Sequence, residues 1–308
     1  MGFKRLLLRT VGGLLVILVG LAGYAWLHYS PMGSVLGSAE AIELPHRLRN
    51  GAEHDAARSK NGGNPYILEF EVPNGASLIY YGASHVSDPR HPQVNDIERH
   101  WERFRPTIAL CEGRSRGFFY GSLIEPFAGL PEPALVHKLA RRDGVPLASL
   151  EPSYEAEVRE LLRSFTAEQV ALYFFLRVYS SEAGGAARED LAVDLLQKRT
   201  NVEGLRGVYP DLQSLDRVWE RDFRDEANWR TQQAEPGYLA RISDTSRRLR
   251  GEHMARNLVK LVNNGERVFA VVGSGHVIRQ EWNLRALLGQ EPAWDQPVLE
   301  ARRVEVME

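Results

Sequence analysis

Apolar residues follow three different patterns along this chain. An uncharged apolar run occupies positions 10–29, directly after Lys4, Arg5 and Arg9. Short apolar segments separated by turn residues follow between 66 and 150, and another lies at 267–272. Between 154 and 264 the apolar residues instead recur at helical spacing, among charged stretches. The three patterns predict a membrane helix, an α/β domain and a large helical insertion within that domain.

The short apolar segments predict the strands of a sheet. Segments 66–72 and 77–81 flank Pro73-Asn74-Gly75, which is typical of a hairpin. Further strands are expected at 107–111, 145–150 and 267–272. Helices are expected near 93–104, 118–127, 133–142 and 278–288. This alternation predicts an α/β fold with a mixed, mostly parallel sheet and helices on both faces.

The remaining segments complete the domain organisation. Residues 30–65 are polar and lack apolar periodicity, which predicts a linker. The insertion at about 154–264 contains an apolar stripe, which predicts core packing; it runs through Val170, Leu172, Tyr173, Phe174 and Leu176. The expected order is a basic N-terminus (1–9), a transmembrane helix or signal anchor (10–29), the linker, and an α/β domain over 66–308.

The N-terminal apolar run is long enough for a helix to cross a hydrocarbon core of about 30 Å. It exceeds the 7–15 or so apolar residues of a usual signal peptide, which favours a retained anchor. Ala39-Glu40-Ala41 resembles a cleavage site, so a cleaved signal is the alternative. The basic flank holds the N-terminus in the cytoplasm, and residues 30–308 are expected across the membrane, in the periplasm if the source is a Gram-negative bacterium.

Charge and cysteine content narrow the chemistry. The chain has 38 Lys+Arg against 40 Asp+Glu, a formal net charge of −2, so no basic excess is present to bind nucleic acid. Its single cysteine, Cys111, can form neither an internal disulfide nor a cysteine-rich zinc site. Cys111 lies within an expected strand, which indicates a small buried hydrophobe. Any metal must therefore be bound by His, Asp or Glu.

Three stretches have the pattern Gly-x-x-His. The stretch ending at His54 lies in the polar lead-in and is set aside. Those ending at His85 and His276 each follow an expected strand directly. The glycine would let the backbone turn sharply off the strand. Both imidazoles are then expected at the strand carboxyl ends, where open α/β sheets bind ligands.

A carboxylate is expected at the same edge, because Glu112 follows strand 107–111. Two histidines and one carboxylate are a common ligand set for a divalent metal. The sequence therefore predicts that His85, Glu112 and His276 bind Mn²⁺, Co²⁺ or Zn²⁺, or hold a water directly. With open coordination positions, such a metal would support hydrolysis.

Four short stretches resemble one known superfamily. They are GASH at 82–85, CEG at 111–113, RGEHMA at 250–255 and GSGH at 273–276. Their order and spacing are similar to those of the TraB/PrgY/GumN family, whose relatives include the Tiki proteases, the erythromycin esterases and the ChaN-like haem-binding lipoproteins. The likeness spans roughly residues 66–290. Relatives usually carry Asp or Asn where this chain has Gly251, and Glu252 and Asn257 are the candidates to compensate.

The resemblance implies a membrane-anchored, extracytoplasmic metal-dependent hydrolase, most closely a peptidase. Its site would comprise His85, Glu112, Arg250 and His276. Glu112 and Arg250 would be catalytic, Arg250 by stabilising the oxyanion that forms on attack. The substrate would be a peptide or a small molecule. Two alternatives remain: a non-catalytic haem-binding or small-ligand-binding regulatory protein of the same fold, and a metal-independent esterase.

Three further side chains are candidates to support the site. Asp88, three residues after His85, could orient the imidazole by accepting its second N–H, but such an Asp more often starts a turn or caps the following helix. Glu151 ends the strand at 145–150 and would lie at the same edge. His253 neighbours Arg250 in the sequence and would have a peripheral role.

Overall fold

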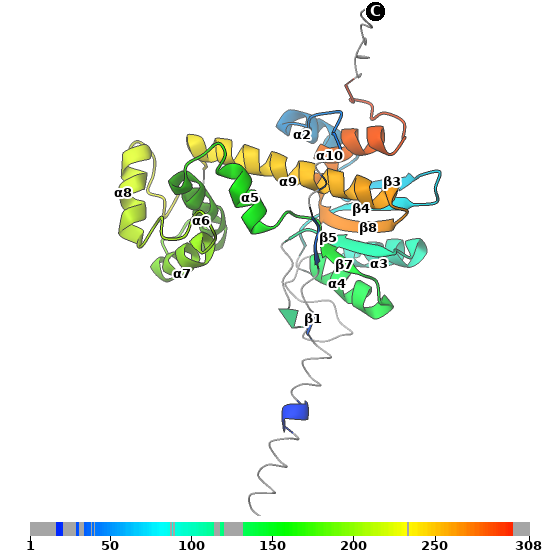
Figure 1. The fold of residues 1–308 in the computed structure, drawn as a ribbon, viewed down its shortest axis with the longest axis horizontal. Helices are drawn as coiled ribbons and strands as arrows, with labels where there is room; N and C mark the ends of the chain where they lie inside the picture. Colours follow the sequence, from blue (N-terminus) through cyan, green and yellow to red (C-terminus); the bar gives the residue numbers. More distant parts are fainter. Residues whose placement is uncertain are drawn as a thin grey trace, which may run out of the picture. The chain divides into compact units, whose positions relative to one another are not determined.

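The chain forms two compact units, seen in a computed structural model that describes residues 17–20, 29–30, 34–37, 39, 41–86, 88, 90–113, 118–119, 132–232 and 234–297 (Figure 1). The sheet unit comprises the residues up to Glu151 and from Met254 onward, and the helical unit comprises Pro152–His253. The helical insertion was expected to extend to 264. The end of the long helix α9 (Tyr238–Asn263) instead belongs to the sheet unit, because Met254 and Leu258 pack into the sheet's core.

The main sheet has six strands in the order β2-β7-β5-β8-β4-β3. Their bounds are β2 Ser34–Val35, β7 Leu147–Ser149, β5 Ile108–Cys111, β8 Arg267–Gly273, β4 Ser77–Ala83 and β3 Tyr66–Glu71. All neighbours pair in parallel except β3, which pairs with β4 in an antiparallel hairpin. The predicted mixed, mostly parallel sheet is confirmed.

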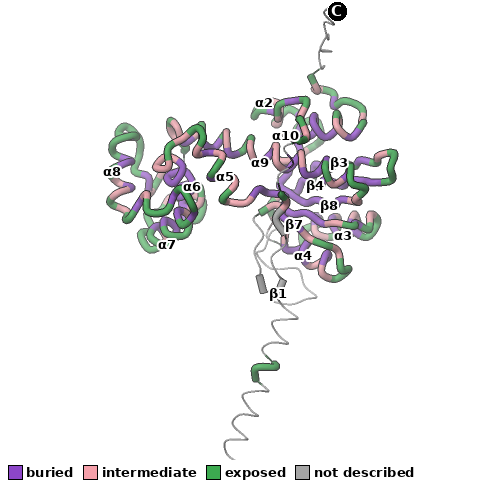
Figure 2. The backbone as a smooth tube through the Cα atoms, viewed as in Figure 1, coloured by how far each residue is buried: buried purple, intermediate pink, exposed green. Residues whose placement is uncertain are grey.

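Burial along the strands follows their place in the sheet (Figure 2). Burial alternates along the edge strand β3. Tyr66, Leu68 and Phe70 are buried, and Glu69 and Glu71 are exposed. Its neighbour β4, an interior strand, is buried at every position, because helices cover both of its faces.

Helices pack on both faces of the sheet, as predicted. On one face, Leu78 and Val268 share a core with α10 (Ser274–Leu287) and the end of α9. On the other, Ile79 and Phe269 share a core with α3 (Pro92–Phe104) and α4 (Glu132–Asp143).

Two expectations for the sheet unit were wrong. The segment expected to be a linker contains β2 and a helix, α2 (Gly51–Lys60), which has a capping box between Asn50 and Glu53. Ala57 is the buried residue of α2, so the sequence shows no apolar stripe. Phe118–Phe119 form strand β6, paired with β1 (Tyr29–Ser30), and not the start of a helix.

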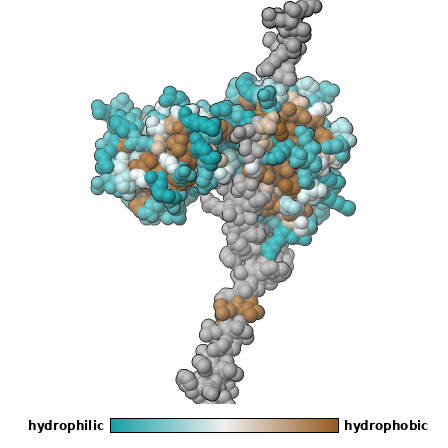
Figure 3. Space-filling model, viewed as in Figure 1, coloured by the Kyte–Doolittle hydropathy of each residue, from teal (hydrophilic) through white to brown (hydrophobic). Residues whose placement is uncertain are grey.

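The expected transmembrane segment lies mostly outside the described residues. Residues 17–20 are helical, and Ile17, Leu18 and Val19 are 60–65% exposed, visible as the hydrophobic patch between grey atoms in Figure 3. In the part of the chain that the structure describes, no helix is both long and apolar enough to cross a membrane.

The helical unit has a core of its own. It contains α5 (Tyr154–Leu161), α6 (Ala167–Ala183), α7 (Glu189–Thr200), α8 (Leu212–Asp222) and the first part of α9. Helix α6 begins with a capping box between Thr166 and Gln169 and ends at Gly184, whose φ is 61°. The five residues of the predicted apolar stripe are all buried in this core, which confirms their packing role.

Candidate functional site

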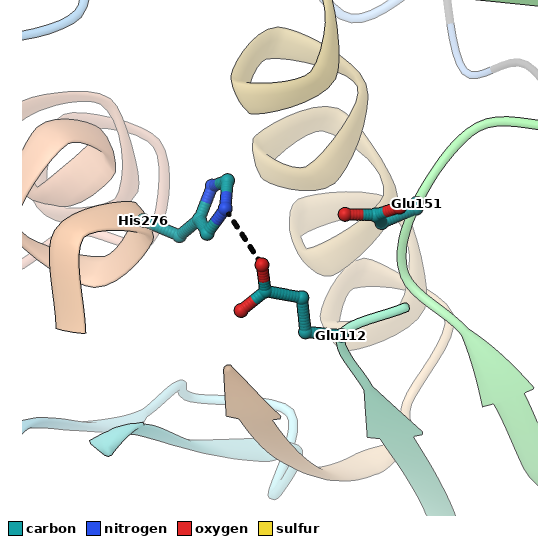
Figure 4. A group of neighbouring side chains, drawn as sticks. All are labelled: Glu112, Glu151 and His276. Carbon is teal, nitrogen blue, oxygen red and sulfur yellow. Dashed lines mark hydrogen bonds and ion pairs between the residues drawn. The ribbon is translucent and has the colours of Figure 1, made fainter. Parts of the chain in front are cut away.

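Glu112 and His276 meet at the carboxyl edge of the sheet. Strands β5 and β8 are parallel neighbours with Cys111 opposite Val271, so the residues after each strand emerge side by side. The Glu112 carboxylate accepts the Gly273 N–H at 2.6 Å through Oε2, and its Oε1 lies 3.2 Å from His276 Nε2 (Figure 4). The structure therefore brings these two predicted residues together.

Glu151 is the third member of this cluster. It is 6% exposed and follows β7, the neighbour of β5. The Ser149 hydroxyl donates to the Gly113 carbonyl at 2.7 Å and accepts the Glu151 N–H at 3.2 Å, which ties the two strand ends together. Ligand atoms of Glu112, Glu151 and His276 all lie within 4.8 Å of one another, and the side chains point toward a common centre in Figure 4.

His85 lies beside this cluster. Its side chain is 67% exposed, and its Nε2 is 3.0 Å from the position that a Cβ on Gly273 would occupy. Glu112 Oε2 is 3.1 Å from the same position, so both side chains approach the backbone of Gly273. The described residues thus group Glu112, Glu151 and His276, which differs from the expected set of His85, Glu112 and His276.

The carboxylate partner of His85 is Glu132, which the sequence analysis missed. Glu132 Oε2 lies 3.4 Å from His85 Nδ1. This hydrogen bond, partly opposed by burial, raises the pKa of His85 above its usual value. Burial opposes ionisation of Glu132, but its hydrogen bonds from His85 and Val86 outweigh burial and lower the pKa of the carboxyl. The two residues are 47 positions apart, and no local pattern connects them.

Asp88 contacts Arg90, which agrees with a turn and not with a role beside His85. Its side chain is 56% exposed, and its hydrogen-bond partner among the described residues is Arg90, through the backbone N–H at 2.9 Å and Nε at 3.4 Å. Asp88 therefore stabilises a turn, which is the usual role of an Asp in such a loop.

A side chain at either motif glycine would crowd its neighbours, and the turn predicted for both is observed at Gly273 but not at Gly82. Gly82 lies within β4, and a Cβ there would be 2.6 Å from the Tyr66 carbonyl oxygen and 2.9 Å from Ser274 Cα. Gly273 ends β8 and α10 begins at the next residue, so the chain turns off the strand there, with a φ of −58° that any residue can adopt. A Cβ at Gly273 would be 3.0 Å from His85 Nε2 and 3.1 Å from Glu112 Oε2, so both side chains would have to give way by a few tenths of an ångström.

The candidates on α9 fall in different units. Arg250, Glu252 and His253 belong to the helical unit, where Arg250 is 8% exposed and Glu252 pairs with Arg248 at 3.1 Å. Asn257 belongs to the sheet unit and is 2% exposed. The roles expected for these four residues stay predictions.

His54, set aside on sequence grounds, lies next to the second histidine motif. Its Nε2 is 3.7 Å from the position of a Cβ on Gly275, and its Nδ1 is 2.9 Å from Asp55 Oδ1. It was set aside because no strand precedes it, and the structure places it in helix α2 instead.

Cys111 is buried, as expected. It is 3% exposed within β5. Burial, with the nearby negative charges of Glu151 and Glu112, raises the pKa of the thiol to about 12. The thiol is therefore protonated near neutral pH and is no nucleophile.

Comparison of the chain with known protein families, with curated proteins and with solved structures finds no match.

Proposed function

We propose that this protein is a metal-dependent hydrolase that cleaves peptide or ester bonds, with peptides as the first substrates to test. The observation that carries the proposal is the convergence of Glu112, Glu151 and His276 at the carboxyl edge of a parallel sheet. The proposal retains the expected topology, with an N-terminal anchor at 10–29 and the α/β domain across the membrane.

The three side chains fit a divalent cation. Carboxylate and imidazole ligands bind Zn²⁺ at about 2.0–2.2 Å. The three ligand atoms lie within 4.8 Å of one another, so the side chains would draw closer together to bind one ion. One nitrogen and two carboxylate donors suit Mn²⁺, Co²⁺ or Zn²⁺.

The neighbouring side chains supply the rest of the chemistry. A divalent cation held here would polarise a scissile carbonyl and lower the pKa of a water molecule. His85 is exposed and hydrogen-bonded to Glu132, so its Nε2 can accept a proton from the attacking water and pass it to the leaving nitrogen or oxygen. A role for Arg250 at the oxyanion rests on the family resemblance alone.

Metal binding to the full chain provides the first test. Titration with Co²⁺, followed by calorimetry and by visible absorption, should show saturable binding, because imidazole and carboxylate ligands give Co²⁺ a distinct spectrum. Glu112→Gln, Glu151→Gln and His276→Gln should each abolish it. Glu71→Gln is the matched control, since Glu71 is an exposed carboxylate on edge strand β3.

Hydrolysis of a peptide library and of ester substrates is then measured with and without chelator. Turnover that stops with chelator and returns with Co²⁺ or Zn²⁺ supports the proposal. Turnover that chelator leaves unchanged would instead identify a metal-independent esterase. Absence of metal binding in the wild-type chain, with a Soret band on haem addition, would replace the hydrolase with a haem-binding protein.

A further inference from the structure

Glu132 has two oxygens with different surroundings. Its side chain is 5% exposed. Oε1 accepts two hydrogen bonds, from the Val86 N–H and from Gln93 Nε2, each at 3.0 Å. Oε2 faces His85 Nδ1 at 3.4 Å. Because Glu132 is the first residue of α4, it is also held at the positive end of a helix.

The orientation of Gln93 is determined by its own contacts. Its Oε1 accepts the Ser84 N–H and its Nε2 donates to the Ser84 carbonyl, both at 2.8 Å. Reversing the amide would place donor against donor and acceptor against acceptor. Gln93 Nε2 must therefore donate to Glu132 Oε1, and a backbone N–H can only donate. The atom at the Oε1 position must therefore be a hydrogen-bond acceptor.

These constraints determine which nitrogen of His85 carries the proton. Burial opposes ionisation of Glu132, but its hydrogen bonds lower the pKa of the carboxyl, so it is ionised at the pH where the His85 ring is neutral. An ionised carboxylate can only accept, so Nδ1 must donate to Oε2. Among the described residues, this is the hydrogen bond that the His85 ring makes. A neutral ring protonated at Nδ1 has its lone pair on Nε2, the atom that lies over Gly273 near Glu112.

We propose that Glu132 is the positioning residue of His85, holding the ring in its Nδ1–H tautomer with the Nε2 lone pair directed at the Glu112 edge of the site. The use of that lone pair in hydrolysis rests on the proposed function, but the tautomer itself does not. An unconstrained histidine in water favours the Nε2–H tautomer, so the proposal predicts the less common form.

A one-atom change should reverse the tautomer. In Glu132→Gln, the amide oxygen must occupy the Oε1 position to satisfy Val86 and Gln93. The amide NH₂ then faces His85 Nδ1 and donates to it, which moves the ring proton to Nε2. Asp88→Asn is the matched control, because it makes the same carboxylate-to-amide change three residues from His85 at a side chain that contacts Arg90.

The measurement is long-range ¹H–¹⁵N NMR of the full chain labelled with ¹⁵N-histidine, metal-free and at alkaline pH, where the ring is neutral. His85→Gln identifies the signal. We expect Nδ1–H for the wild type and for Asp88→Asn, and Nε2–H for Glu132→Gln. A wild-type ring in the Nε2–H form, or no reversal in a folded Glu132→Gln, would overturn the proposal. If Glu132→Gln does not fold, the wild-type spectrum decides.

The catalytic consequence has a separate readout. If the chain is the proposed hydrolase, Glu132→Gln should lower kcat by about 10- to 100-fold with a smaller change in KM, whereas Asp88→Asn should change neither. A chain that hydrolyses nothing but shows the Nδ1–H tautomer would reject the proposed function and leave the positioning role of Glu132 intact.

Discussion

Alanine substitution at three motif glycines tests whether these glycines are present because of close packing. Gly273 and Gly275 lie in the same tetrapeptide and differ in what a methyl group would meet. At Gly275 the nearest atom would be 3.7 Å away, an ordinary van der Waals contact. At Gly273 it would meet His85 Nε2 at 3.0 Å and Glu112 Oε2 at 3.1 Å. At Gly82 it would meet backbone atoms of Tyr66 and Ser274 at 2.6 and 2.9 Å.

The contacts predict three different changes in the free energy of unfolding. Gly275 is helical, so alanine should stabilise by about 0.5–1 kcal/mol. Gly273→Ala makes Glu112 give way by a few tenths of an ångström, which weakens its hydrogen bond from the Gly273 N–H. The weakening costs part of the about 1.5–3 kcal/mol that a charged hydrogen bond contributes, and the entropic gain of alanine offsets about 0.4–1 kcal/mol. At Gly82 the backbone cannot yield, and overpacking should cost about 3 kcal/mol.

Urea unfolding of the full chain, followed by circular dichroism, ranks the stabilities of the three variants and the wild type. Gly275→Ala should have the highest unfolding midpoint, followed by the wild type and then by Gly273→Ala. Gly82→Ala should have the lowest. Gly273→Ala should also weaken Co²⁺ binding, and Gly275→Ala should not. Close packing does not explain these glycines if Gly82→Ala unfolds at the wild-type midpoint, or if Gly273→Ala is as stable as Gly275→Ala.

Three further predictions concern buried groups. The pKa of Cys111 is raised to about 12 by burial, so at about pH 8 the folded chain should not react with iodoacetamide, whereas the chain in urea should. Burial lowers the pKa of His137 to about 4, so on acidification from 6.5 toward 4 the unfolded state binds a proton that the folded state does not. Unfolding titrations should show up to about 3 kcal/mol lost across that window, and His137→Leu should remove the loss. Arg49 is fully buried and pairs with Glu281 at 2.6 Å, so Arg49→Met should cost about 3–5 kcal/mol in urea unfolding; a cost near that of Arg47→Met, about 0–1 kcal/mol at an exposed ion pair, would contradict this.

Periodicity was enough to locate the sheet and one of its edges. The apolar segments ending at Cys111 and Val272 are short and continuous, which is typical of strands buried on both faces. Carboxyl ends of parallel strands meet at one edge, so Glu112 and His276 could be placed together without coordinates. The same rule placed Glu151 there, and the structure brings it into the cluster.

The partners of each side chain depended on contacts between segments distant in the chain. Glu132 meets His85 across 47 residues because α4 and the loop after β4 pack together, and no local spacing records that contact. Asp88, the nearer carboxylate, is held by Arg90 in a turn. The reason for the motif glycines was also not visible in the sequence. Neighbouring atoms of β3, α10 and the site leave little room for a side chain, whereas the φ angles of these glycines are open to any residue. Local pattern therefore determined which residues reach the sheet edge, while packing between distant elements decided which of them bind one another.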